Sequence, residues 1–111
     1  MQVLFKARST EALALRDVAV SRIEFALRRL RWMAPRARVQ LEDVNGPRGG
    51  VDKRCRIELR APAGQPVVVT SMATDWRSAL DAALSSAVRA LLRWWQRHRH
   101  RSAAARRLPS P

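Results

Sequence analysis

The chain has little cysteine and no long apolar run, and these shortages exclude several classes of protein. Cys55 is the only cysteine among the 111 residues, so neither an internal disulfide nor a zinc site of several cysteines can form. No apolar run approaches the ~20 residues that a membrane-spanning helix needs. The apolar run within residues 1–6 is too short for a signal peptide, and no small-residue cleavage site follows it. We therefore expect a cytoplasmic protein.

The sequence also lacks the residue groupings of common enzymes. Both histidines, His98 and His100, lie near the C-terminus, which leaves no Ser-His-Asp grouping and indicates a solvated basic tail rather than a metal site. The glycine-rich stretch 46–53 lacks the Gly-Lys-Ser/Thr ending of a phosphate-binding loop. Asp75 and Asp81 fit the start of a helix better than an acid/base pair. We expect no enzyme, no metal, no cofactor and no small-molecule substrate.

Positive charge, in contrast, is abundant. The chain has 22 Lys+Arg against 9 Asp+Glu, a net charge of +13, and no acid follows Asp81. Only Lys6 and Lys53 are lysines. GC-biased codon usage explains that preference for arginine as well as a functional need for arginine does, but it does not explain the excess of positive charge. Such a field attracts polyanions, which predicts nucleic acid as the partner, with an anionic membrane surface as the second choice.

Hydrophobic periodicity predicts the element order β-α-β-β-β-α. We expect a strand near residues 2–6, and then a helix that starts at Ser9-Thr10-Glu11 and runs to about Met33 before Pro35. Three further strands are expected near residues 38–44, 54–60 and 67–70, with turns at 45–50 and 62–64. A second helix should be capped by Thr74 or Asp75 and should fray between His98 and Ser102.

These elements predict an α+β fold in which both helices pack on one face of a four-stranded sheet. The first strand joins the sheet through a helical crossover, so it should run parallel to its neighbour. The last helix should bury Trp76, Leu80, Ala83, Leu84, Ala87, Leu91, Trp94 and Trp95. The opposite sheet face should stay open. We expect one monomeric domain over residues 1–98 and a flexible basic tail over residues 99–111.

Residues 41–56 (LEDVNGPRGGVDKRCR) closely resemble a stretch in one subgroup of the hibernation-promoting factor family, which also contains the ribosome-associated inhibitor. Asp75, Ala79 and Asp81 match the family's second-helix start, Asp-x-Tyr-x-Ala-Ile-Asp, and residues 9–13 resemble the start of its first helix. The resemblance covers residues 1–98. Arg77 stands where the family usually has tyrosine, and Ser86 where a basic residue is common. Without the additional C-terminal domain of long members, the chain is similar to the short form.

The resemblance implies a ribosome hibernation factor. Family members bind the small subunit between head and body, in the groove used by mRNA and by the A- and P-site tRNAs. They contact 16S rRNA through basic residues, block initiation and protect stored ribosomes. Two alternatives stay open: a generic double-stranded-RNA or nucleic-acid binding module of similar topology, and a peripheral membrane or partner-binding protein that uses the Trp/Arg helix.

Three basic clusters are the candidate rRNA contacts. The first is an i, i+4, i+8 stripe on the last helix, the second lies on the first helix and at its end, and the third follows the glycine-rich turn. Their members are Arg89, Arg93 and Arg97; Arg22, Arg28, Arg29 and Arg31; and Lys53, Arg54 and Arg56. Each cluster has a structural alternative, such as a solvated helix face, or cross-strand pairing of Arg54 and Arg56 with Glu42 and Glu58. Trp94 and Trp95 favour the core edge over base stacking.

Overall fold

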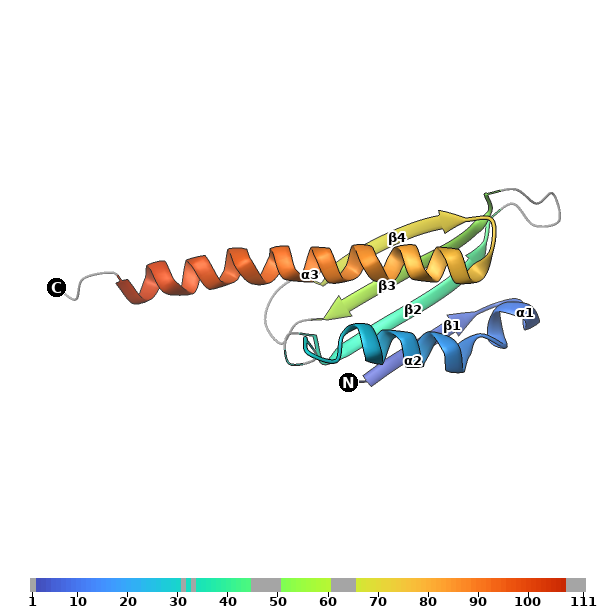
Figure 1. The fold of residues 1–111 in the computed structure, drawn as a ribbon, viewed down its shortest axis with the longest axis horizontal. Helices are drawn as coiled ribbons and strands as arrows, with labels where there is room; N and C mark the ends of the chain where they lie inside the picture. Colours follow the sequence, from blue (N-terminus) through green and yellow to red (C-terminus); the bar gives the residue numbers. More distant parts are fainter. Residues whose placement is uncertain (1, 31, 33, 45–50, 61–65, 108–111) are drawn as a thin grey trace.

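In the computed structural model the elements follow the order β1-α1-α2-β2-β3-β4-α3 (Figure 1). The structure describes all residues except 1, 31, 33, 45–50, 61–65 and 108–111, and for residues 98–107 it describes the backbone alone. The element bounds are β1 Gln2–Ala7, α1 Thr10–Leu13, α2 Arg16–Ala26, β2 Arg36–Asp43, β3 Lys53–Arg60, β4 Val67–Ala73 and α3 Trp76–Arg107. The turns expected at 45–50 and 62–64 lie outside the described residues.

The four strands form one sheet in the order β1-β2-β3-β4. β1 runs parallel to β2, as the helical crossover predicts, and the remaining pairs are antiparallel. In β2 and β3 every second residue is apolar and buried, which places Val39 beside Ile57 and Leu41 beside Cys55 on the core face. This alternation is the period-2 pattern that the sequence shows. Glu58, on the other face of β3, is also buried.

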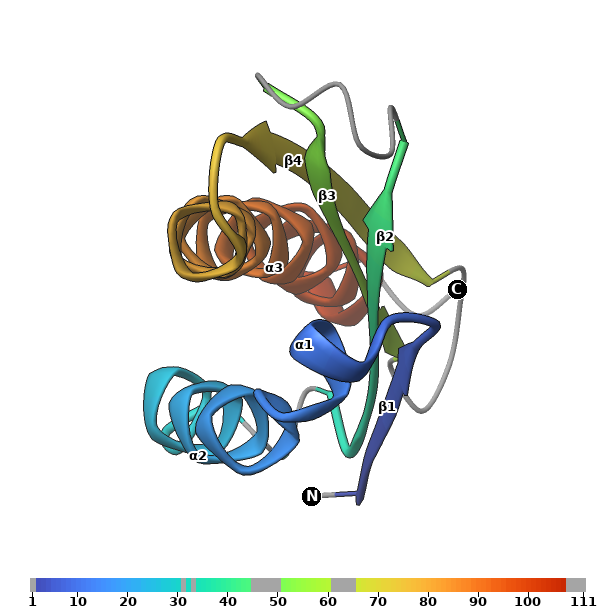
Figure 2. The same cartoon turned by 90° about the vertical axis from the view of Figure 1, so that its right-hand side faces the viewer.

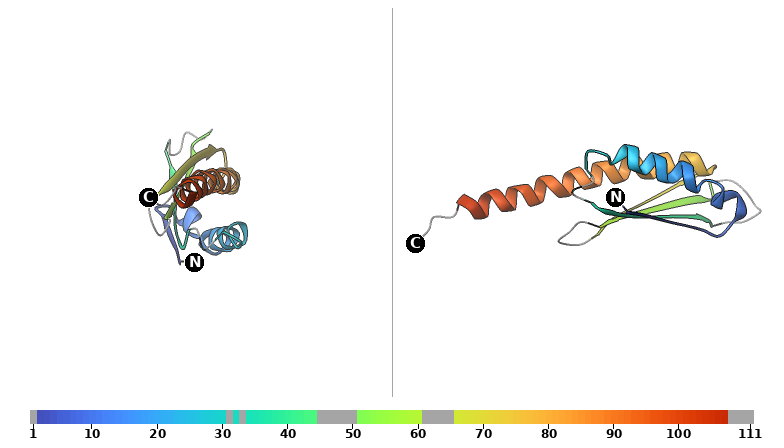
Figure 3. Two further views of the ribbon diagram at one scale, coloured as in Figure 1. Left: turned by 90° about the vertical axis from the view of Figure 1, so that its left-hand side faces the viewer. Right: turned by 90° about the horizontal axis from the view of Figure 1, so that it is seen from below.

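Both long helices lie on the same face of the sheet (Figures 2 and 3). α3 packs against β3 and β4, while α2 contacts β1 and α3. Buried residues of the sheet and of both long helices join in one core, among them Ile23 of α2, Ile57 of β3 and Leu91 of α3. The predicted α+β architecture with an open second sheet face is therefore confirmed.

The first helix is shorter than predicted, and it is broken. The sequence favours one helix from Ser9 to about Met33, whereas the structure has α1, a break at Ala14 and Leu15, and α2, which ends at Ala26. A crossover between parallel strands only has to return along the length of the strand. A six-residue strand spans about 20 Å, and a 25-residue helix would span about 37 Å. The turn at residues 27–30 brings the chain back to β2 while Leu27 remains buried.

α3 starts as predicted but ends later. The Asp75 carboxylate caps it by accepting a hydrogen bond from the Ser78 N–H at 2.8 Å. The helix continues to Arg107 and extends well beyond the sheet (Figure 1), so the expected end between His98 and Ser102 is wrong. Alanines at 103–105 explain the extension, because alanine has the highest helix propensity. Of the helices in the described part of the chain, none is both long and apolar enough to cross a membrane.

Candidate nucleic-acid interface

The arginine stripe of α3 is exposed along its whole length. Arg89, Arg93 and Arg97 are all solvent-accessible, and within the described residues no carboxylate forms an ion pair with them. Arg89 donates a weak hydrogen bond to the hydroxyl of Ser86 at 3.4 Å. Because none of the three guanidinium groups is neutralised, each remains free to bind a phosphate oxygen.

A second group of arginines lies beside this helix, just past the end of α2. Arg28 and Arg29 are both exposed, and Arg28 lies over the ring of Phe25 with its guanidinium carbon 5.6 Å from the ring centroid. Together with Leu92 of α3 they line one hollow between the helices. The structure thus brings two of the predicted clusters to neighbouring elements. Arg31 lies outside the described residues.

Two tryptophans join the segment after α2 to α3. The rings of Trp32 and Trp95 meet edge to face, with their centroids 4.7 Å apart, and the Trp32 indole N–H donates to the carbonyl of Arg29 at 3.1 Å. Trp94 and Trp95 are partly buried and pack against the core, as the sequence predicts. These contacts hold the Arg28–Arg29 segment beside the α3 stripe.

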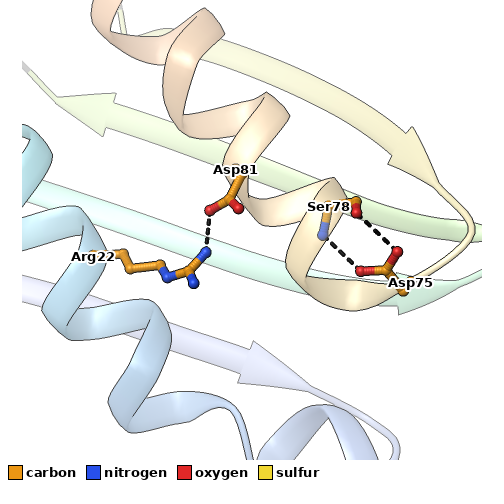
Figure 4. A network of polar contacts seen from close by, with 4 residues as sticks. All are labelled: Arg22, Asp75, Ser78 and Asp81. Carbon is orange, nitrogen blue, oxygen red and sulfur yellow. Dashed lines mark hydrogen bonds and ion pairs between the residues drawn. The ribbon is translucent and has the colours of Figure 1, made fainter.

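Arg22 is engaged in the fold. Its guanidinium forms an ion pair with Asp81 of α3, and in Figure 4 the two side chains point toward each other across the gap between the helices. Close by, Asp75 accepts from both the backbone N–H and the hydroxyl of Ser78, and these hydrogen bonds lower the pKa of the Asp75 carboxyl. Arg22 is therefore partly neutralised, unlike the arginines of the α3 stripe.

The third predicted cluster is divided between structural and free cations. Lys53 contacts Asp43 at 2.7 Å and the buried Asp52 at 3.5 Å, and its ammonium lies 5.2 Å from the centroid of the Trp76 ring. The hydrogen bond to Asp43 and the nearby carboxylates raise the pKa of Lys53. Arg54 pairs with Glu42 across β2 and β3, as the sequence suggests.

Arg56 is exposed on the open sheet face, and no ion pair involves it within the described residues. Glu58, its suggested partner, pairs instead with Arg60 at 3.2 Å. Sequence reasoning missed two further arginines on this face, Arg36 and Arg38, which with Arg60 line a hollow of about 430 Å³. The signal was their alternation with Ala37 and Val39. Arg38 already lay in the predicted strand, whereas Arg36 fell outside it because β2 begins two residues earlier than predicted.

Other reactive groups in the described residues are inert or absent. Burial raises the pKa of the Cys55 thiol to about 12, so the thiol stays protonated and unreactive near neutral pH. The described side chains contain no group of three or more histidine, cysteine or acidic residues placed to hold a metal ion. Exposed guanidinium groups beside an exposed aromatic ring are suited to binding a polyanion through contacts with phosphates and bases.

Comparison with known proteins shows what fold this arrangement belongs to. No protein-family model matches the chain, and no curated protein matches it. The N-terminal domain of Protein Y from Thermus thermophilus superposes with a TM-score of 0.64 at 23% identity, covering 85% of this chain and 99% of that domain. A ribosomal subunit interface protein from Coxiella burnetii gives a TM-score of 0.64 at 14% identity, covering 86% of this chain and 99% of that protein. The chain therefore has the fold of these two proteins, and the resemblance drawn from its sequence is matched at the level of the fold.

Proposed function

We propose that the protein is a ribosome-associated factor that binds 16S rRNA of the small subunit in the mRNA/tRNA channel and silences or protects idle ribosomes. The observation that carries the proposal is the set of unneutralised arginines on α3 and after α2, on the helical side of the domain: Arg28, Arg29, Arg89, Arg93 and Arg97. The fold shared with a protein named for the ribosomal subunit interface supports the ribosome as the partner.

The mechanism is occlusion by shape and charge. Each guanidinium offers a planar set of donors that matches phosphate oxygens, and a rigid domain bound in the channel excludes mRNA and tRNA sterically. The long-range field of a +13 chain accelerates encounter with the ribosome, because its surface potential is strongly negative. No covalent step is required.

Co-sedimentation with purified small subunits tests the proposal. Replacing Arg89, Arg93 and Arg97 together by Glu should abolish binding, while circular dichroism stays unchanged because all three side chains are exposed. The matched control replaces Arg8, Arg16 and Arg77 by Glu, which makes the same change in net charge at exposed positions away from the stripe. Equal loss in both variants would mean that net charge alone drives binding.

Translation in a reconstituted system tests the silencing step. The wild-type protein should inhibit initiation in proportion to its occupancy of small subunits, and the α3 variant should not inhibit. In sedimentation of a cell extract, migration of the protein with free RNA would support a generic RNA-binding module. Migration with membranes would support a peripheral membrane protein. Binding without inhibition would contradict the proposed occlusion of the channel.

A further inference from the structure

Phe25 is the most exposed large apolar side chain in the described part of the chain, with 74% of its surface accessible. It lies on the last turn of α2 and packs into no core. Aromatic rings of this size ordinarily contribute to packing, because burying them is strongly favourable. Apart from the Arg28 guanidinium over it, the ring is open to solvent on a strongly basic surface, which calls for a partner with which it can pack.

Phe25 and its neighbour Ala26 line two hollows between α2 and α3. The first hollow, about 380 Å³ in volume, is also lined by Arg28, Arg29 and Leu92. The second, about 420 Å³, is lined by the Arg22–Asp81 ion pair and by Ser21 and Ser85. One hollow thus offers cations to an anionic group, while the other offers neutral hydroxyl groups and a paired carboxylate.

We propose that Phe25 is a stacking platform for an unpaired nucleobase of RNA. The face of the ring opposite Arg28 receives the base, Arg28 and Arg29 hold the adjacent phosphates, and the hydroxyl groups of Ser21 and Ser85 reach the edge of the base. An exposed aromatic side chain beside arginines is the pattern by which proteins bind single-stranded RNA, because every base has a π-face. The inference deepens the proposed function and rests on it.

Charge favours RNA over an apolar protein surface as the occupant. Arg28 and Arg29 flank the ring, and the acid in the second hollow, Asp81, is already paired with Arg22. An apolar partner would have to desolvate these guanidinium groups without satisfying them, which is costly. A nucleotide suits both the ring and the cations, since its base stacks on Phe25 while its phosphate neutralises the guanidinium groups.

The test compares a short single-stranded RNA of mixed sequence with an abasic oligonucleotide of the same backbone and length. Wild-type protein should prefer the base-containing RNA, and Phe25→Ala should remove that preference. Loss of one stacked base should weaken binding about 5- to 150-fold. Phe25→Leu should behave like Phe25→Ala, whereas Phe25→Trp should retain wild-type affinity.

Salt dependence separates stacking from charge. Phe25→Ala should lower affinity equally at every salt concentration, because stacking releases no counterions. Arg28→Gln should instead reduce the slope of log affinity against log salt. Leu13→Ala, which removes a side chain that is 49% exposed on α1, is the control and should change neither quantity. The melting temperature of Phe25→Ala should match that of the wild type, because the ring is exposed.

The outcomes distinguish the inference from the proposed function. If wild-type protein fails to bind small subunits, the proposed function fails. If it binds them but Phe25→Ala binds both RNA and subunits as the wild type does, only the stacking platform is overturned. Weaker binding to subunits with unchanged binding to both oligonucleotides would assign the ring to a ribosomal protein. Full affinity in Phe25→Leu would show that the ring makes a generic apolar contact. This result, like a contact with a ribosomal protein, would overturn the nucleobase site.

Discussion

The guanidinium of Arg22 pairs with the carboxylate of Asp81, and this contact joins α2 to α3 on the proposed RNA-binding side (Figure 4). The Arg22 and Asp81 side chains are 36% and 58% exposed, so the pair contributes only about 0.2–1 kcal/mol to stability. Its larger effect is on the surface field. Asp81 is the last acid in the sequence, and it neutralises a cation beside Phe25.

Asp81→Asn should therefore strengthen binding to small subunits several-fold. The change frees the Arg22 guanidinium for a phosphate, and the slope of log affinity against log salt should steepen by up to about one unit. Unfolding by denaturant should show a loss of no more than about 1 kcal/mol. Asp17→Asn makes the same chemical change at an exposed position at the start of α2. An equal gain in both variants would show that the pairing with Arg22 is irrelevant.

The helical surface should contribute more phosphate contacts than the open sheet face. Replacing Arg89, Arg93 and Arg97 by Gln should reduce the slope of log affinity against log salt by about two to three units, because each lost phosphate contact removes roughly 0.7–0.9. The same replacement of Arg36, Arg38 and Arg56 should change the slope by less than one unit. Fluorescence titrations over a range of salt concentrations measure both slopes. A larger reduction of the slope in the sheet-face variant would show that the RNA binds the sheet face.

The edge-to-face contact of Trp32 with Trp95 should couple the two residues energetically. Aromatic pairs in this geometry contribute about 0.5–1.5 kcal/mol beyond the area that they bury. A double-mutant cycle with Trp32→Ala and Trp95→Ala, followed by urea denaturation, measures that coupling. Trp32→Ala should also weaken RNA binding slightly, because the Arg28–Arg29 segment loses a contact that positions it. A coupling energy near zero would show that the contact of Trp32 with Trp95 does not hold the Arg28–Arg29 segment against α3.

Stability should fall at high pH because of Cys55. Burial raises the pKa of this thiol from 9.0 to about 12, so the unfolded chain loses the proton first. Between these two values the folded state holds more protons, and the free energy of unfolding falls with rising pH by up to about 1.4 kcal/mol per unit. Cys55→Ala should abolish this part of the slope.

Lys53 adds a decline of the same sign, because its pKa is also raised in the folded state. Its stabilising contribution is fully present below 10.5 and is lost as the pH rises through the folded pKa. Lys53→Met should therefore flatten a separate part of the curve of unfolding free energy against pH. Denaturation by urea at a series of pH values measures both changes, and an unchanged slope in Cys55→Ala would contradict the assignment to the thiol.

The element types could be predicted from the sequence because they follow from local periodicity, and the parallel pairing of the first strand could be predicted because a helical crossover requires it. Alternation in β2 and β3 assigns Val39, Leu41, Cys55 and Ile57 to one face, and the structure buries all four. The spacing of Leu80, Leu84, Ala87 and Leu91 likewise determines which side of α3 meets the sheet. The hydrogen-bonding geometry of helices and strands makes this inference independent of distant residues.

Helix lengths depend on the tertiary structure instead. The apolar spacing of residues 15–30 continues past the true end of α2, because the pattern contains no information on the distance that the crossover must cover. That distance is determined by the length of β1 and the position of β2. At the other end, α3 continues beyond the sheet, where packing no longer limits its length and alanine propensity decides.

The arginine clusters could be located from the sequence, but their state of charge pairing could not. Arg22 and Arg29 look alike along the chain, yet Asp81, 59 positions beyond Arg22, pairs with Arg22. Lys53 contacts Asp43, Asp52 and the Trp76 ring, whereas Arg56, three residues further, points away from the helices. A net charge of +13 follows from composition alone. Which cations are left to bind RNA is decided only by the fold, because it brings distant carboxylates within a few ångströms of some cations but not of others.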